Sequence, residues 1–216
     1  MSHSMTFARL RARSTLLAIA GALLLAACGS PQVIVEGNFP APLVEPEPVD
    51  IGIWYTEEFR NHVFTEAGKK RGGGWVVETG AAQVQMWDGV FVGMFENIVY
   101  LTEAPGNGTA PAVDAVLIPH VAELQYAIPA HTNVKVYEIW MRYRFELVTP
   151  AGDALGAWEM TSYGKTPTAF LQTDEAAVNG AAIMALRDAG ANFVTSFNRV
   201  PAVKEWLSQQ GAAREG

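Results

Sequence analysis

The sequence predicts an α+β fold, a two-layer sandwich in which a mainly antiparallel sheet carries two helices packed on one face. Residues 115–128, 135–149 and 154–163 alternate apolar and polar side chains with the period of two that is typical of half-buried strands. Two other stretches, 84–95 and 173–197, repeat apolar residues at steps of three and four, which indicates amphipathic helices. Helices with one apolar stripe each can bury it against the apolar face of such a sheet.

The three strands are expected to form an antiparallel meander, because segments containing proline separate them at 129–133 and 150–153. One side of the middle strand is apolar and the other carries charge, which predicts one buried and one solvent-facing surface. The apolar side comprises Tyr137, Ile139, Met141, Tyr143, Phe145 and Leu147, and the other side comprises Glu138, Trp140, Arg142, Arg144 and Glu146. In the first strand, one shared side is expected for Val116, Ile118, Ala122, Leu124, Tyr126 and Ile128.

The remaining elements are shorter. Strands are expected at 51–55, 75–78 and 98–101, and a closing helix at 203–207. Thr173 can cap the second long helix, where Asp174 would interact favourably with the helix dipole. Gly89 and Gly93 in the first long helix have the spacing of small residues that permits close packing, here expected against the helix's own sheet.

The N-terminal residues resemble a bacterial lipoprotein signal. Arg9, Arg11 and Arg13 precede the apolar residues 14–25, a run shorter than the roughly 20 residues that span a bilayer. Leu25-Ala26-Ala27-Cys28 matches the lipobox, which implies cleavage of a 1–27 signal peptide. An ordinary signal peptide or a plain N-terminal anchor are the alternatives.

Cys28 is the only cysteine, so an intramolecular disulfide is excluded. Acyl chains such as palmitate on Cys28 would attach the protein to a membrane stably. By resemblance to bacterial lipoproteins, Gly29 favours the outer membrane, with the domain on its periplasmic face. The leader holds three basic and no acidic residues, so its removal changes the net charge from −7 to −10. Such an acidic protein lacks the basic footprint of nucleic-acid binding.

Residues 28–49 are expected to be the lipidated cysteine and a tether rich in proline and acidic residues. The alternative is an arm packed on the domain, with Val33–Val35 paired as a short strand. Residues 50–207 are expected to form a single α+β domain, and 208–216 a frayed tail.

The segment Gly68–Gly74 contains Lys69, Lys70 and Arg71 but does not match a phosphate-binding loop, which requires Gly-Lys followed by Ser or Thr. A flexible basic turn is the simplest interpretation. Contact of these cations with anionic lipid, glycan or an acidic partner is the functional alternative.

No motif predicts catalysis, a cofactor or a metal site. His62, His120 and His131 lack the spacing of metal ligands, and His120 lies among apolar residues, so we expect a core or edge position for it. Glu138 and Glu146 share a face of the predicted middle strand with Arg142 and Arg144. This favours cross-strand charge pairs over a pair of catalytic carboxylates for hydrolysis. No serine lies in a Gly-x-Ser-x-Gly motif.

Trp140 and Trp158 are the candidate partner-binding aromatics, together with Arg142 and Arg144. Trp140 lies on the charged side of its strand, where a large aromatic is out of pattern, and aromatic residues and arginines are enriched at interfaces. The alternative is a sheet face covered by the tether or by the 104–112 loop.

The lipobox, the tether, the long 137–147 strand, the hairpin, the alanine-rich helix and the closing segment at Trp206 together resemble the YajG-type and ABC-transport auxiliary lipoproteins, whose domain is similar to the N-terminal domain of TolB. The resemblance covers most of residues 50–207 as an order of elements. It implies an accessory, non-enzymatic role in the envelope, with an envelope protein as partner. A small-molecule or lipid-binding module is the alternative, followed by a hydrolase with a dispersed site. The sequence leaves the oligomeric state open.

Overall fold

The computed structural model describes residues 30–66, 74–108, 110–132, 134–169 and 171–215. The chain divides into two units, Met1–Pro31 and Gln32–Gly216, and every element named below belongs to the second. In chain order these are β1 (Gln32–Ile34), β2 (Glu47–Ile53), α2 (Glu57–Arg60), β3 (Val63–Thr65), β4 (Val76–Glu78), α3 (Gly80–Met94), β5 (Phe95–Tyr100), β6 (Ala115–Ala127), α4 (Pro129–Thr132), β7 (Val136–Val148), β8 (Ala154–Pro167), α5 (Asp174–Ser196), a 3-10 turn (Phe197–Arg199) and α6 (Pro201–Glu215).

The main sheet has five strands in the order β5-β2-β6-β7-β8. The expected antiparallel meander is confirmed in β6, β7 and β8. The sheet as a whole is mixed, since β2 lies between β5 and β6 and runs parallel to both. A second sheet of three short strands, in the order β1-β4-β3, was not anticipated.

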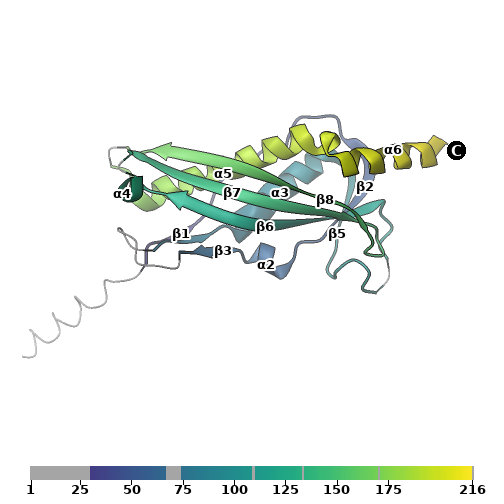
Figure 1. Cartoon of the computed structure of the whole chain (residues 1–216), viewed down its shortest axis with the longest axis horizontal. Coiled ribbons are helices and arrows are strands. Elements are labelled where there is room, and N and C mark those ends of the chain that lie inside the picture. The colour runs from purple at the N-terminus through teal and green to yellow at the C-terminus, as the bar shows by residue number, and fades with distance from the viewer. Residues whose placement is uncertain (1–29, 67–73, 109, 133, 170, 216) are drawn as a thin grey trace, which may run out of the picture. The chain divides into compact units, whose positions relative to one another are not determined.

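Helices α3 and α5 pack on one face of the main sheet, which confirms the predicted α+β class (Figure 1). The core between the layers is aromatic. Trp87 of α3 lies edge-on to Tyr143 and Phe145 of β7, with ring centroids 5.3 and 5.0 Å apart. Phe193 of α5 contacts Phe145 at 4.9 Å. These rings are fully buried, so the period-two pattern of β7 identified its buried side correctly.

Strand β6 departs from the predicted alternation, because its pairing with β7 shifts register between Val121 and Glu123. One extra residue at such a bulge exchanges the two faces of a strand. Val116 and Ile118 therefore do not share a side with Leu124. Together with Val148 they form a separate small cluster, which packs against Trp54, Leu101 and Val113.

Residues 35–46, here called the strap, connect β1 to β2. The expectation of a free tether over 28–49 was wrong for the residues from 32 onward, and the packed-arm alternative describes them, with Val33 buried and β1 paired to β4. Phe39 is buried, and Asn179 of α5 exchanges two hydrogen bonds with the backbone of Glu36, at 3.1 and 3.2 Å. A Pro-rich segment can thus be ordered when individual side chains and carbonyls find partners on the fold.

Gly89 and Gly93 explain how the strap approaches α3. A Cβ on Gly93 would lie 2.7 Å from Pro42 Cδ, and one on Gly89 would lie 3.3 Å from the carbonyl oxygen of Phe39. The two glycines therefore admit the strap, not the sheet as expected. The last helix also runs beyond the domain end expected at residue 207, since α6 continues to Glu215.

Candidate functional site

The candidate site is the side of β6, β7 and β8 that faces away from α3 and α5, here called the outer face. Strand register places its residues in rows across the three strands. Its members are His120, Glu123, Gln125, Trp140, Arg142, Arg144, Glu146, Glu159, Thr161 and Tyr163. Side chains opposite one another in adjacent antiparallel strands are close enough to interact, so this surface is a single connected patch.

Trp140 and Tyr163 form its aromatic part. The two residues pair directly across β7 and β8, their ring centroids are 5.2 Å apart, and 39% and 36% of their surfaces are exposed. The Tyr163 hydroxyl donates a 2.5 Å hydrogen bond to Glu138, and this bond raises the pKa of Tyr163. The same hydrogen bond orients the Tyr163 ring beside Trp140.

An open groove of about 390 Å³ lies next to Trp140. Its lining combines the indole with hydrogen-bonding side chains, namely Glu123, Gln125, Arg142 and Thr161, together with Met141. Volumes of this order lie within the roughly 300–1,000 Å³ of common ligand pockets. The groove can therefore accept a side chain or a short segment of a partner.

Arg142 lies between two carboxylates. Its Nη2 is 2.9 Å from Glu123 Oε2 on β6, and its Nη1 is 3.9 Å from Glu159 Oε2 on β8. All three side chains are more than 40% exposed, so each ion pair stabilises the fold by no more than about 1 kcal/mol. The arrangement fixes the guanidinium beside Trp140 without making the surface cationic.

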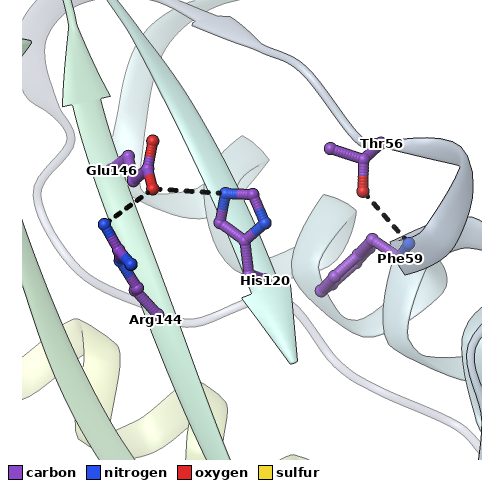
Figure 2. Close-up of polar contacts among 5 residues, drawn as sticks. All are labelled: Thr56, Phe59, His120, Arg144 and Glu146. Atoms are coloured by element: carbon purple, nitrogen blue, oxygen red, sulfur yellow. Dashed lines mark hydrogen bonds and ion pairs between the residues drawn. The ribbon is translucent and has the colours of Figure 1, made fainter. Parts of the chain in front are cut away.

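A second polar group occupies the next rows of the outer face (Figure 2). Glu146 Oε1 is 3.0 Å from Arg144 Nη2 and 3.8 Å from His120 Nε2. This position corrects the expectation that His120 is a core or edge histidine. The register shift in β6 places His120 opposite Arg144, with a third of its side chain exposed. The cross-strand pairing expected for the strand acids is present at Glu159 with Arg142, whereas the Glu146–Arg144 pair lies within β7 and Glu138 accepts from Tyr163 instead.

Helix α2 lies beside this end of β6. Its N-cap is Thr56, whose Oγ1 accepts a 3.1 Å hydrogen bond from the Phe59 amide (Figure 2). A cavity of about 80 Å³ separates α2 from His120 and Val121. That volume is well below the roughly 300 Å³ lower limit of ligand pockets, so we assign no ligand to it.

His62, shortly after α2 in the sequence, belongs to a chain of side-chain hydrogen bonds. Its Nδ1 lies 2.6 Å from Thr79 Oγ1, which also accepts a 2.6 Å hydrogen bond from Gln83 Nε2. Nδ1 can accept a hydrogen bond from the Thr79 hydroxyl when that nitrogen carries no proton. Burial lowers the pKa of His62, which agrees with a neutral ring.

The structure brings only some of the predicted partner-binding residues together. Trp140, Arg142 and Arg144 share the outer face. Trp158 does not, because its ring stacks on Phe145 at 5.4 Å and lies 6.1 Å from Phe197, on the side covered by the helices. The prediction that Trp158 joins Trp140 on one surface was therefore wrong. Lys69, Lys70, Arg71 and Cys28, which is predicted to be lipidated, lie outside the described residues.

Sequence reasoning missed Glu123, Gln125, Thr161 and Tyr163. A signal for the last two exists, because the 150–153 turn sets the register of β7 and β8 and pairs Arg142 with Thr161 and Trp140 with Tyr163. The β6 residues had no comparable signal, since the bulge reverses their side. Within the described part of the chain, no three His, Cys, Asp or Glu side chains are grouped so as to hold a metal.

Comparisons with known proteins give structural similarity only. No protein-family model matches the chain, and no curated protein matches it. Protein XCC0632 of the DUF330 family from Xanthomonas campestris is similar over 85% of this chain and 99% of its own, with a TM-score of 0.51 and 13% identity. A minor lipoprotein from Acinetobacter baumannii is similar over 72% and 92%, with a TM-score of 0.36 and 11% identity. No helix of the described residues is long and apolar enough to cross a membrane. At this level of identity, what the chain shares with the Xanthomonas protein is its fold.

Proposed function

We propose that this chain is a lipid-anchored, non-enzymatic accessory protein of the bacterial envelope, which binds another envelope protein through its outer face. The observation that carries the proposal is the exposed Trp140–Tyr163 pair beside a groove lined by hydrogen-bonding side chains. Aromatic residues and arginine are enriched where proteins bind one another. We also propose that the protein belongs to the YajG-type or ABC-transport auxiliary lipoproteins and is anchored in the outer membrane.

The outer face suits a partner that combines apolar and polar groups. Trp140 offers apolar area at a low entropic cost, because its ring already contacts Tyr163. The carboxylates of Glu123 and Glu159 hold the Arg142 guanidinium in place. A partner that replaces one of these carboxylates with its own would gain an ion pair while leaving the other in position.

The proposed anchor adds confinement. Acyl chains on Cys28 would restrict the domain to the membrane surface and raise its effective concentration for partners there. Strand β1 begins at Gln32, so only residues 29–31 separate the proposed lipidation residue Cys28 from β1. Partners within reach are therefore those close to the membrane.

Crosslinking in intact cells followed by affinity capture tests this proposal. The full chain should capture a reproducible envelope protein, and Trp140→Ala with Arg142→Ala should reduce the capture at least tenfold. Met184→Ala, at an exposed position of α5, is the matched control and should capture like the wild type. Cys28→Ala should weaken capture through loss of the anchor. Undiminished capture by the double variant would exclude the outer face.

A hydrolase with a dispersed site is the competing function. It would require an activity on glycan, ester or peptide substrates that disappears when one acid is replaced. Glu146 is the most informative acid, because Arg144 and His120 both lie within 4 Å of it. Full activity of a Glu146→Gln variant would leave this alternative without its best candidate residue.

A further inference from the structure

A second site lies on the opposite side of the molecule, between the strap and helices α3 and α5. It is a cleft of about 440 Å³ whose walls are almost entirely apolar. Its lining comprises Phe39, Pro40, Ala41, Pro42, Met86, Val90, Arg187, Gly190, Ala191, Val194 and Thr195. We propose that this cleft binds the hydrocarbon chain of a long-chain fatty acid, with the carboxylate on Arg187. The proposal does not depend on the outer face.

The floor of the cleft is sealed by close packing of the two helices. A Cβ on Gly190 would lie 3.0 Å from Val90 Cγ2 and 3.2 Å from Met86 Sδ, so a larger side chain there would need these neighbours to move. Ala191, one residue further along α5, adds a small exposed side chain at the mouth. Gly190 therefore lets α3 and α5 meet at the floor, and the small side chain of Ala191 leaves the mouth open.

The strap forms the roof and is held away from this floor. Phe39 is buried, and Pro42 packs on Gly93, so the strap is fixed on either side of the cleft. Pro40 and Pro42 have a restricted backbone, which resists collapse of the short segment between these two contacts. The cleft is thus built by a stiff segment with defined attachment points.

Arg187 supplies the one charged group of the lining. Its Nε and Nη2 donate to the Asn38 carbonyl, at 3.3 and 2.9 Å. A guanidinium has five N–H donors, so these bonds leave donors for an anion. Among the described residues, no carboxylate forms an ion pair with Arg187 in this acidic protein.

These features favour a single-chain anionic amphiphile. A cleft of about 440 Å³ lies near the lower end of the roughly 300–1,000 Å³ range of small-molecule pockets, which fits one chain better than the two of a phospholipid. Each methylene buried there contributes about 0.8 kcal/mol, so the chain supplies most of the affinity. The carboxylate would set the orientation through Arg187.

Photo-labelling of the full chain in phosphatidylcholine nanodiscs tests the proposal. The probes are a photoreactive, clickable palmitic acid and its methyl ester. The acid should label peptides that contain residues 39–42 and 191–195. Ala191→Trp should fill the cleft and reduce this labelling at least fivefold, whereas Ala176→Trp, at an exposed alanine of α5 outside the lining, should not. Thr195→Trp replaces Ala191→Trp if the latter fails to fold.

Arg187→Gln distinguishes two roles of Arg187, binding the carboxylate of the fatty acid and holding the strap. It should reduce labelling by the acid several-fold and leave labelling by the ester unchanged. An equal reduction for both probes would mean that Arg187 only holds the strap, and would overturn the carboxylate assignment. Absence of labelling in the presence of excess phospholipid, or labelling that Ala191→Trp leaves intact, would overturn the fatty-acid site.

Discussion

The two faces of β7 differ completely although their residues alternate along one strand. Tyr143 and Phe145 are fully buried against Trp87 and Phe193, whereas Arg142 and Arg144 are about half exposed and paired with carboxylates. The aromatic face holds the helices to the sheet. The outer face forms only exposed ion pairs, which stabilise little. We therefore expect stability and the proposed binding to depend on different residues of one strand, so that each can be altered separately.

The largest expected difference is between Phe145→Ala and Arg144→Ala. Phe145 contacts Trp87, Trp158 and Phe193, so its truncation should lower the free energy of unfolding by about 3–5 kcal/mol. Arg144→Ala should cost less than about 1 kcal/mol. Urea denaturation monitored by circular dichroism measures both. Similar losses for the two variants would contradict the division between the faces.

Gly164→Ala tests how closely α5 packs on β8. Its Cβ would lie 2.1 Å from the Ala181 carbonyl oxygen and 2.2 Å from the Ala185 nitrogen, so helix and strand would have to separate. We expect a loss at the upper end of the roughly 1–3 kcal/mol typical of overpacking. Gly211→Ala is the matched control, because no atom lies within 4 Å of its Cβ, and it should be neutral or stabilising. A neutral Gly164→Ala would refute this close packing.

The pH dependence of the unfolding free energy tests the environment of His62. Burial lowers the pKa of His62 in the folded state, so the unfolded chain binds more protons near the ordinary pKa of about 6.5. The contribution of His62 is therefore complete above that value and is lost as the pH falls below it. His62→Gln should flatten the decline in unfolding free energy between a pH of about 7.5 and about 5.5. A decline that is undiminished in His62→Gln would contradict the assignment.

The smallest effect on stability is expected for the candidate site itself. Trp140→Ala should lower the unfolding free energy by about 1 kcal/mol, since 39% of the residue is exposed and its ring pairs across the strands with Tyr163. The same variant should lose most of its partner capture. A loss of several kcal/mol would instead make Trp140 a structural residue, and reduced capture would then no longer identify a binding surface.

The sequence predicted the class of fold and the long strands because amphipathic periodicity records which side of an element is buried. Tyr143, Phe145 and Phe193 lie where their patterns placed them. The bulge at Val121–Glu123 could not be anticipated. The pattern of apolar and polar residues along one strand does not show where its pairing with the neighbouring strand shifts register. The parallel position of β2 depends on long-range pairing, which local pattern does not record.

The candidate site was predicted in part, for the same reason. Trp140, Arg142 and Arg144 share a side within one strand, which periodicity alone can identify. Trp158 was assigned to the binding surface because the turn between β7 and β8 was not used to find which β7 residue lies opposite it. That residue is the buried Phe145. The strap was mistaken for a free tether, because proline and charge are typical of both linkers and packed arms. The neighbours of Glu36 on α5 and of Phe39 on α3 are distant in sequence.

Site-specific photo-crosslinking in living cells tests the central claim most directly. A photoreactive amino acid at Thr161, which lines the groove beside Trp140, is compared with the same amino acid at Met184, which is exposed on α5. If the outer face is the binding surface, a crosslink to one envelope protein forms from Thr161 and none forms from Met184. A crosslink from Met184 alone, or none from Thr161 at normal expression, would contradict the outer face as the binding surface.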